Sequence, residues 1–426
     1  MSLFFMTERS IAKFLEPFPR FRAIVKNVYL RLNYVFQKEV PSCEVSKGTF
    51  LKETVKTDRT LRPIKEYFFG YYDKNPWSLD MKFMLMHQVR SDGKVNVLII
   101  DENGGSRVIG SSSAWNWQQG AMTQWIPGRP ISVIYNDIDG SNLVSIIVDV
   151  ESGKKKTIPI PFQSIDPTGL KALTLNYRRL YALRSEYGYA ADVRNFSHDM
   201  PLEKDGIWLV DIERGTNKLI LSLKDLIEFK KEESMEGAFH KVNHIIYSPN
   251  GNRFIFMHRW ITTHGKISRL YMYDIKTARL EILLDGRMVS HYSWKDNDSI
   301  ITWTRSVETG DRYFLLDVNT LQKSIVGDGV FDKLGDGHPS FSPDGRYIIS
   351  DTYPDKARRR HLLLYDYPTG QISDIAQFHA PWKYDGNNRC DLHPRWSPDG
   401  KNISFDSTHE GFRNSYILNV SKLLKR

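Results

Sequence analysis

The string GDGHPSFSPDG at residues 335–345 returns as CDLHPRWSPDG at residues 390–400. Both strings end with an aromatic residue and Ser-Pro-Asp-Gly, and a related copy, YSPNG, stands at 247–251. Pro at the second position and Gly after Asp or Asn are typical of a tight turn between antiparallel strands. Degenerate copies of the turn are WSLDM (77–81), WIPGR (125–129), IDPTG (165–169) and WKDND (294–298).

A second mark alternates with these turns. It is a short β-rich run that ends in Asp or Asn, such as VLIID at 97–101 or LLLYD at 362–366. The seven copies lie 43 to 63 residues apart, which is the length of a four-stranded propeller blade with insertions. We therefore predict an all-β protein, a seven-bladed β-propeller over residues 66–426. A two-sheet sandwich would not explain seven regular units.

Residues 1–40 follow a different pattern. Apolar residues between positions 21 and 36 recur at helical spacing, with basic residues among them. This pattern predicts an amphipathic helical segment, which either caps the propeller or lies on a membrane surface or a protein partner. Residues 41–65 are predicted to be a linker that includes a strand closing the ring.

The amino-acid composition favours some classes of binding partner over others. The 426 residues carry a net charge of +9, which favours acidic partners. The basic residues are spread along the chain without a nucleic-acid-binding motif, so we predict no nucleic acid partner. Two cysteines, no long apolar run and no signal-peptide pattern predict a cytoplasmic protein. Where the N-terminal helix lies on a membrane rather than on the propeller, the protein would be peripheral to the inner membrane.

Histidine recurs at one place in the repeat. Three residues before the aromatic of the turn, the last four blades carry His244, His291, His338 and His393. The first strand of a blade lies nearest the channel, so these rings are expected to converge on one side of the axis. There they would hold a divalent metal or an anionic substrate. The alternative is a repeated scaffold role, in which each ring bonds the backbone of a neighbouring blade.

The second strand of each blade returns to the same face, and polar residues stand at its end. We expect a pocket at this rim. Its candidate residues are His87, Arg178, His258, Arg259, Arg305, Asp351 and Asp406. Tyr189, in the long insertion 179–206, is placed to cover the channel mouth, and Tyr72 is a candidate for stacking on a sugar ring.

The repeats HPSFSPDGRYI and HPRWSPDGKNISF resemble Tol-type propeller repeats, and the wider pattern resembles bacterial propellers encoded among surface-polysaccharide genes. Among propellers of known chemistry, the sequence is most similar to polysaccharide lyases, especially oligogalacturonate lyase and the ulvan lyases. The resemblance implies an acidic sugar bound in the axial funnel and one divalent metal (Mn, Zn or Ca) held among histidines of the late blades. The glutamine and the paired histidines of that family are not reproduced in RCDLHPRW.

Two functions follow as hypotheses. The first is a lyase that acts by β-elimination on a uronic-acid glycan. In this reading His258 or Tyr189 is the base, Arg178 and Arg259 clamp the carboxylate, and Arg305, His87, Tyr72, Asp351 and Asp406 bind substrate. The second is a non-catalytic propeller that binds a glycan or assembles polysaccharide-making enzymes. The residues leave open whether the protein is an enzyme.

Overall fold

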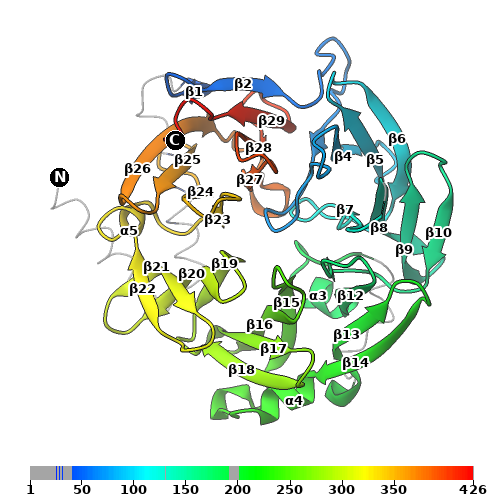
Figure 1. Cartoon of the computed structure of the whole chain (residues 1–426), viewed down its shortest axis with the longest axis vertical. Helices are drawn as coiled ribbons and strands as arrows, with labels where there is room; N and C mark the ends of the chain where they lie inside the picture. The colour runs from blue at the N-terminus through cyan, green and yellow to red at the C-terminus, as the bar shows by residue number, and fades with distance from the viewer. Residues whose placement is uncertain are drawn as a thin grey trace.

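The computed structural model describes residues 41–129, 131–190 and 201–425, together with the single helical positions Val25, Val28 and Arg31. Seven antiparallel sheets stand around a central axis like the blades of a propeller (Figure 1). The predicted seven-bladed propeller is confirmed. The predicted N-terminal amphipathic segment, residues 1–40, lies outside the described residues apart from those three positions.

The first three blades follow the chain in order. Blade 1 contains β3 (Tyr67–Phe68), β4 (Phe83–Val89), β5 (Val95–Asp101) and β6 (Ser106–Ser112). Blade 2 contains β7 (Gln124–Trp125), β8 (Ser132–Asp139), β9 (Asn142–Asp149) and β10 (Lys155–Ile158). Blade 3 contains β11 (Ser164–Ile165), β12 (Lys171–Leu175), β13 (Gly206–Asp211) and β14 (Thr216–Ser222).

The last four blades carry the histidines. Blade 4 contains β15 (Phe239–Tyr247), β16 (Arg253–Thr262), β17 (Gly265–Asp274) and β18 (Arg279–Leu284). Blade 5 contains β19 (Val289–Trp294), β20 (Ser299–Ser306), β21 (Gly310–Asp317) and β22 (Lys323–Val326). Blade 6 contains β23 (Ser340–Phe341), β24 (Tyr347–Asp351), β25 (Arg359–Asp366) and β26 (Gln371–His379), and blade 7 contains β27 (Arg395–Trp396), β28 (Asn402–Ser407) and β29 (Asn414–Asn419).

The ring is closed by the segment predicted to be a linker. β2 (Phe50–Glu53) pairs with β29 and becomes the outer strand of blade 7. β1 (Cys43–Val45) pairs with β26 and adds a fifth strand to blade 6. The start of the propeller therefore completes its last two blades, which ties the two ends of the domain together.

Hydrogen bonds explain the repeated Ser-Pro-Asp-Gly turn. In blade 6 the amide of Gly345 donates to the carbonyl of Ser342 at 2.8 Å, and the Ser342 hydroxyl accepts from the amide of Tyr347 at 2.9 Å. In blade 7 the Ser397 hydroxyl accepts in the same way from Asn402 at 3.0 Å. The serine thus closes the loop between the first two strands of a blade, which is why it recurs with Pro and Gly.

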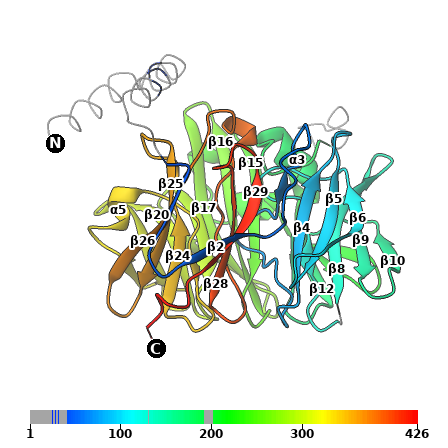
Figure 2. The same ribbon diagram turned by 90° about the horizontal axis from the view of Figure 1, so that it is seen from above.

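Short helices decorate the sheets. They are α3 (Tyr177–Leu183), α4 (Leu223–Glu228), α5 (Phe331–Leu334) and the 3-10 turns η2 (Leu202–Lys204), η3 (Glu233–Met235) and η4 (Gly386–Asn388). Seen from the side, α3 and the end of β16 lie toward the same edge of the ring (Figure 2). None of the helices within the described ranges has the length and apolar character that a bilayer crossing requires.

Candidate active site in the central channel

The structure brings the four predicted histidines together at the centre of the ring. The ring centroids of His291 and His338 are 4.2 Å apart, and those of His338 and His393 are 4.3 Å apart. Tyr71 completes the group, because its ring lies 4.8 Å from that of His393 and stacks on that of His244 at 4.8 Å. The common register of the inner strands thus places side chains from four blades in one cluster.

Two of these imidazoles have a defined tautomer. The Nδ1 of His338 donates to Asp351 Oδ1 at 2.8 Å, and the Nδ1 of His393 donates to the carbonyl oxygen of Gly70 at 3.0 Å. A carboxylate and a carbonyl are acceptors, so each Nδ1 carries a proton and Nε2 is the ring nitrogen left for a ligand. Both Nε2 atoms are buried and have no hydrogen-bond partner among the described residues.

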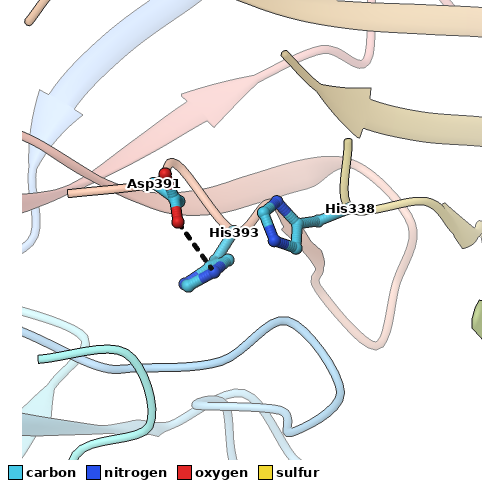
Figure 3. A group of neighbouring side chains, drawn as sticks. All are labelled: His338, Asp391 and His393. Atoms are coloured by element: carbon cyan, nitrogen blue, oxygen red, sulfur yellow. Dashed lines mark ion pairs between the residues drawn. The ribbon is translucent and has the colours of Figure 1, made fainter. Parts of the chain in front are cut away.

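Asp391 faces the same two rings. One ligand atom each from His338, Asp391 and His393 lie within 4.8 Å of one another (Figure 3). Burial raises the pKa of Asp391, but Arg360 and Arg389 outweigh burial and hold that pKa below its usual range. The Arg360 guanidinium lies 2.8 Å from one carboxylate oxygen, and Arg389 Nε donates to the other at 2.8 Å. Asp391 is therefore an anion beside two imidazole lone pairs.

This donor set fits a divalent transition metal. Two imidazoles and one carboxylate are ligands that manganese and zinc share, whereas calcium prefers oxygen alone. Asp351 supplies the outer support that a metal-binding histidine commonly has, because its carboxylate fixes the His338 ring through Nδ1. The same carboxylate accepts from the backbone amides of His338 and His393, at 2.8 and 3.0 Å.

The other two histidines border this centre. Burial lowers the pKa of His244, and the cations Arg184 and Arg259 lower it further. Burial also lowers the pKa of His291, against the opposing effect of Asp336, whose carboxylate lies 2.9 Å from His291 Nδ1. Both imidazoles are therefore neutral at neutral pH, like that of His393, whose pKa is lowered first by burial.

Backbone strain coincides with two of the histidines. His244 and His393 have φ angles of 53° and 48°, in the left-handed region that residues with a side chain rarely adopt. Met122, at the same register in blade 2, shares this conformation with a φ of 53°. The kink therefore belongs to the inner-strand geometry of several blades, and at His244 and His393 it carries an imidazole.

The loop that carries Tyr71 is held by Asp406. The Asp406 carboxylate accepts from the amides of Phe69 and Gly70 at 3.1 and 3.2 Å and pairs with Arg395 at 2.9 Å. Gly70 has a φ of 132°, and a Cβ there would lie 2.9 Å from the backbone of Gln119. Only glycine fits this close approach. Asp406 therefore positions the loop, as Asp351 positions the histidines.

Tyr72 is also bonded to the scaffold. Its hydroxyl donates to the carbonyl of Tyr292 at 2.8 Å and accepts from the Tyr292 amide at 3.0 Å. Its ring lies 5.1 Å from that of His338. Tyr72 thus lines the cluster with its ring, while its hydroxyl is used within blade 5.

Arg259 and His258 are separated by the pleat of β16. Successive side chains of a strand point to opposite faces. Arg259 opens on a cavity of about 410 Å³ next to α3, whereas His258 is fully buried on the other face. His258 Nε2 lies 3.0 Å from His240 Nδ1, and its ring lies 5.4 Å from that of Trp260. The role of His258 as a base stays a prediction, and its surroundings indicate packing.

Four more of the predicted residues make their hydrogen bonds and ion pairs with residues outside the histidine cluster. Tyr189 is fully buried, stacks on Tyr177 at 4.5 Å and accepts from Asn136 at 3.0 Å. His87 uses both ring nitrogens, on the Phe69 carbonyl and the Thr123 hydroxyl, each at 2.8 Å. Arg178 donates to the carbonyl of Ser141 at 2.5 Å, and Arg305 is exposed and pairs with Asp311 at 2.7 Å. Their proposed catalytic or substrate roles stay predictions.

Several residues of the site were not foreseen. Asp391 stands two residues before His393, and Asp336 stands two residues before His338, so the repeated Asp-x-His-Pro was a readable signal. Lys241 had a weaker signal, because its inner strand, Phe239–Tyr247, also carries the polar residues His240, Asn243 and His244. Tyr71 had none, since its place depends on contacts between residues 337 positions apart in the chain.

The fold and the cluster define a seven-bladed β-propeller with a histidine and aspartate centre in its channel. No family model matches the chain. An oligogalacturonate lyase in complex with manganese superposes with a TM-score of 0.63 at 16% identity, covering 90% of this chain and 97% of that one. An oligogalacturonate lyase from Vibrio parahaemolyticus gives 0.60 at 14% identity, with 91% and 100% covered.

A prolyl endopeptidase shares the propeller at a TM-score of 0.50 and 11% identity, over 84% of this chain and 50% of that one. Among curated sequences, the Tol-Pal system protein TolB of Roseobacter denitrificans is 27% identical over 101 residues. That match spans 24% of this chain and 20% of the TolB protein. These likenesses establish the fold, and they extend to propellers of unrelated activity.

Proposed function

We propose that the protein is a metal-dependent lyase that cleaves an acidic, uronic-acid-containing oligosaccharide by β-elimination. The observation that carries this proposal is the pair of Nε2 atoms of His338 and His393, which have no hydrogen-bond partner among the described residues and lie beside the Asp391 carboxylate. Buried polar atoms normally have hydrogen-bond partners. The lack of a partner at both Nε2 atoms therefore favours a ligand bound by the two histidines together. The structural likeness to an oligogalacturonate lyase in complex with manganese supports the same reading.

His338, His393 and Asp391 would hold the metal ion. A bound divalent ion supplies a Lewis acid that stabilises negative charge next to a sugar carboxylate. Asp351 and the Gly70 carbonyl keep both rings in the tautomer that presents Nε2. Arg360 and Arg389 keep Asp391 ionised. The chain thus presents the ionised carboxylate of Asp391 and the Nε2 atoms of His338 and His393 to the metal.

The carboxylate of the substrate needs a cation, and we assign this role to Arg259. It lies at the cavity beside α3 with its Nε unpartnered among the described residues. A planar guanidinium binds a carboxylate with two hydrogen bonds and withdraws charge as the proton next to it leaves.

For the base we propose His244. Its ring is neutral, its Nδ1 has no partner within the described part of the chain, and Tyr71 and Tyr187 fix its orientation from two sides. Arrival of an anionic sugar raises the pKa of an imidazole that cations now hold down, which makes it a better proton acceptor. His258 and Tyr189 remain the alternatives that the same assay separates.

The test is elimination of trigalacturonate in the presence of Mn²⁺, followed by the ultraviolet absorbance of the new conjugated double bond. We expect activity in the wild type, a loss of at least about 100-fold in His338→Ala and His244→Gln, and full activity in the control His361→Ala, which lies outside the channel. No product from any acidic oligosaccharide would contradict the lyase. Binding without turnover would then favour a glycan-binding platform.

A further inference from the structure

The cavity beside α3 collects cations at the mouth of the channel. Its volume is about 410 Å³, and it is bounded by the segment after α3, by the inner strands of blade 4 and by Asn387. Arg184, Lys241, Arg259 and Lys266 line it, together with one acid, Glu186. Glu186 lies 3.5 Å from Arg184 and 3.7 Å from Arg389, so its charge is shared with cations other than Lys241.

Lys241 and Arg259 are an unusual pair. They stand directly opposite each other on β15 and β16. Like charges at such positions destabilise a sheet, because neighbouring side chains on one face are in contact. Exposure does not relieve the repulsion, because Lys241 is 1% and Arg259 7% exposed. Two buried basic side chains therefore face each other, and no carboxylate among the described residues pairs with either of them.

Their hydrogen-bonding capacity is also unused. The Nζ of Lys241 and the Nε of Arg259 have no partner among the described residues. Arg259 makes one long bond, from Nη2 to the Val289 carbonyl at 3.3 Å. By contrast, Lys74 at the other end of the channel, beside a larger cavity of about 920 Å³, pairs with Asp73 at 2.5 Å. Buried basic groups whose donors have no partner are costly, so the arrangement favours an anionic ligand that would accept from both side chains.

A chain of aromatic contacts joins this cavity to the histidine cluster. The Arg184 guanidinium lies 4.3 Å from the centroid of the Tyr187 ring. The Tyr187 ring meets those of His244 and Tyr71 edge to face, at 5.0 and 5.9 Å. Tyr71 in turn contacts His393. The buried side chains of Tyr187 and Tyr71 therefore connect the cavity to the centre of the channel through direct contacts.

We propose that Lys241 and Arg184, next to Arg259, form an anion subsite that holds the carboxylate of a second acidic sugar, beside the sugar whose carboxylate Arg259 binds. This inference rests on the proposed function, and it narrows the substrate to an oligosaccharide with at least two acidic residues. Arg259 then contacts the oligosaccharide between the histidine cluster and the anion subsite. Lys266, on the rim, adds attraction from the solvent side.

Binding to the full-length chain tests the subsite. The probe is trigalacturonate, measured by calorimetry with Mn²⁺ and again with a chelator, so that the metal centre and the subsite are separated. We expect Lys241→Met and Arg259→Gln each to raise the Kd by at least about tenfold in both conditions. The control Lys218→Met, an exposed lysine on β14, leaves the Kd unchanged.

Three outcomes would overturn the inference. One is an unchanged Kd in both variants when thermal unfolding shows that they are folded. The second is equal affinity for the fully methyl-esterified trisaccharide, which has no carboxylate. The third is inorganic sulfate binding as tightly as the trisaccharide, which would make this a site for a free oxoanion. If the wild type binds trigalacturonate, the variants weaken that binding and no elimination occurs, the lyase proposal is refuted. The proposal of the anion subsite would then still hold.

Discussion

Asp351 holds two histidines of the site in place through hydrogen bonds. Its two carboxylate oxygens accept the backbone amides of His338 and His393 and the Nδ1 proton of His338. The residue was expected from the sequence to bind substrate at the end of a second strand. Its hydrogen bonds to the protein favour a positioning role, and its role in substrate binding stays a prediction.

We expect Asp351→Asn to lower the affinity for Mn²⁺ by about 10- to 100-fold, because an amide no longer fixes the charge and tautomer of the His338 ring. A Mn²⁺ titration that counts the free ion measures this. The matched control is Asp374→Asn, which removes a similar carboxylate, 2.7 Å from His361 Nδ1, outside the channel. An equal loss in both variants, or none in either, would refute the role.

The buried position of Lys241 predicts that the stability of the fold depends on pH. Burial, followed by Arg184, Arg259 and Lys266, lowers its pKa from the usual 10.5 to about 6, against the opposing effect of Glu186. Between these values the unfolded chain binds a proton that the folded chain does not. The stability of the fold therefore falls as the pH drops from about 10.5 to 6.

Lys241→Met removes this penalty, so we expect its Tm to exceed that of the wild type by roughly 2–6 °C near pH 6 and to match it above pH 10.5. Thermal unfolding across this range measures the difference. A gain that is independent of pH would mean that packing, and not charge, is responsible.

At the scale of the elements, the positions of the inner strands were predictable from the sequence. The position of the loop that carries Tyr71 was not. Each inner strand keeps one spacing between the histidine and the aromatic turn, so the sequence alone placed His244, His291, His338 and His393 on one side of the axis. The second strands were harder to interpret, because adjacent residues such as His258 and Arg259 face opposite sides of β16. The place of Tyr71 depends on Asp406, from another blade.

The strand that closes the ring offers a test at this scale. The amide of Thr54, just after β2, donates to the carbonyl of Ser415 at 2.9 Å, and the amide of Ser46, just after β1, donates to Ile375 at 2.9 Å. Thr54→Pro removes a hydrogen bond of the closure and is expected to cost about 3 kcal/mol of unfolding free energy. Ser46→Pro removes an equivalent bond at the exposed edge of blade 6.

We expect the midpoint of urea unfolding to fall clearly in Thr54→Pro and less in Ser46→Pro, because β1 adds an edge strand while β2 joins the ends of the ring. Equal shifts in the two variants would show that the closure contributes no more than any outer strand.

For the molecule as a whole, the repeat pattern was sufficient to predict the architecture, because each blade carries its own turn and end marks. Function does not follow from the ring, which carries several activities among similar structures. It depends on the few side chains in the channel and at its mouth. The net charge of +9 is consistent with an acidic ligand, and Lys241 and Arg259 offer such a ligand buried donors that have no partner among the described residues.

The stoichiometry of Mn²⁺ binding tests the central claim most directly. Titration of the full-length chain, with the free ion counted by electron paramagnetic resonance, is predicted to give one bound ion per chain in the wild type and in His361→Ala. It is predicted to give none in His393→Ala, which removes one of the two free Nε2 atoms. A wild-type chain that binds no ion, or a His393→Ala variant that binds as well as the wild type, would contradict the account.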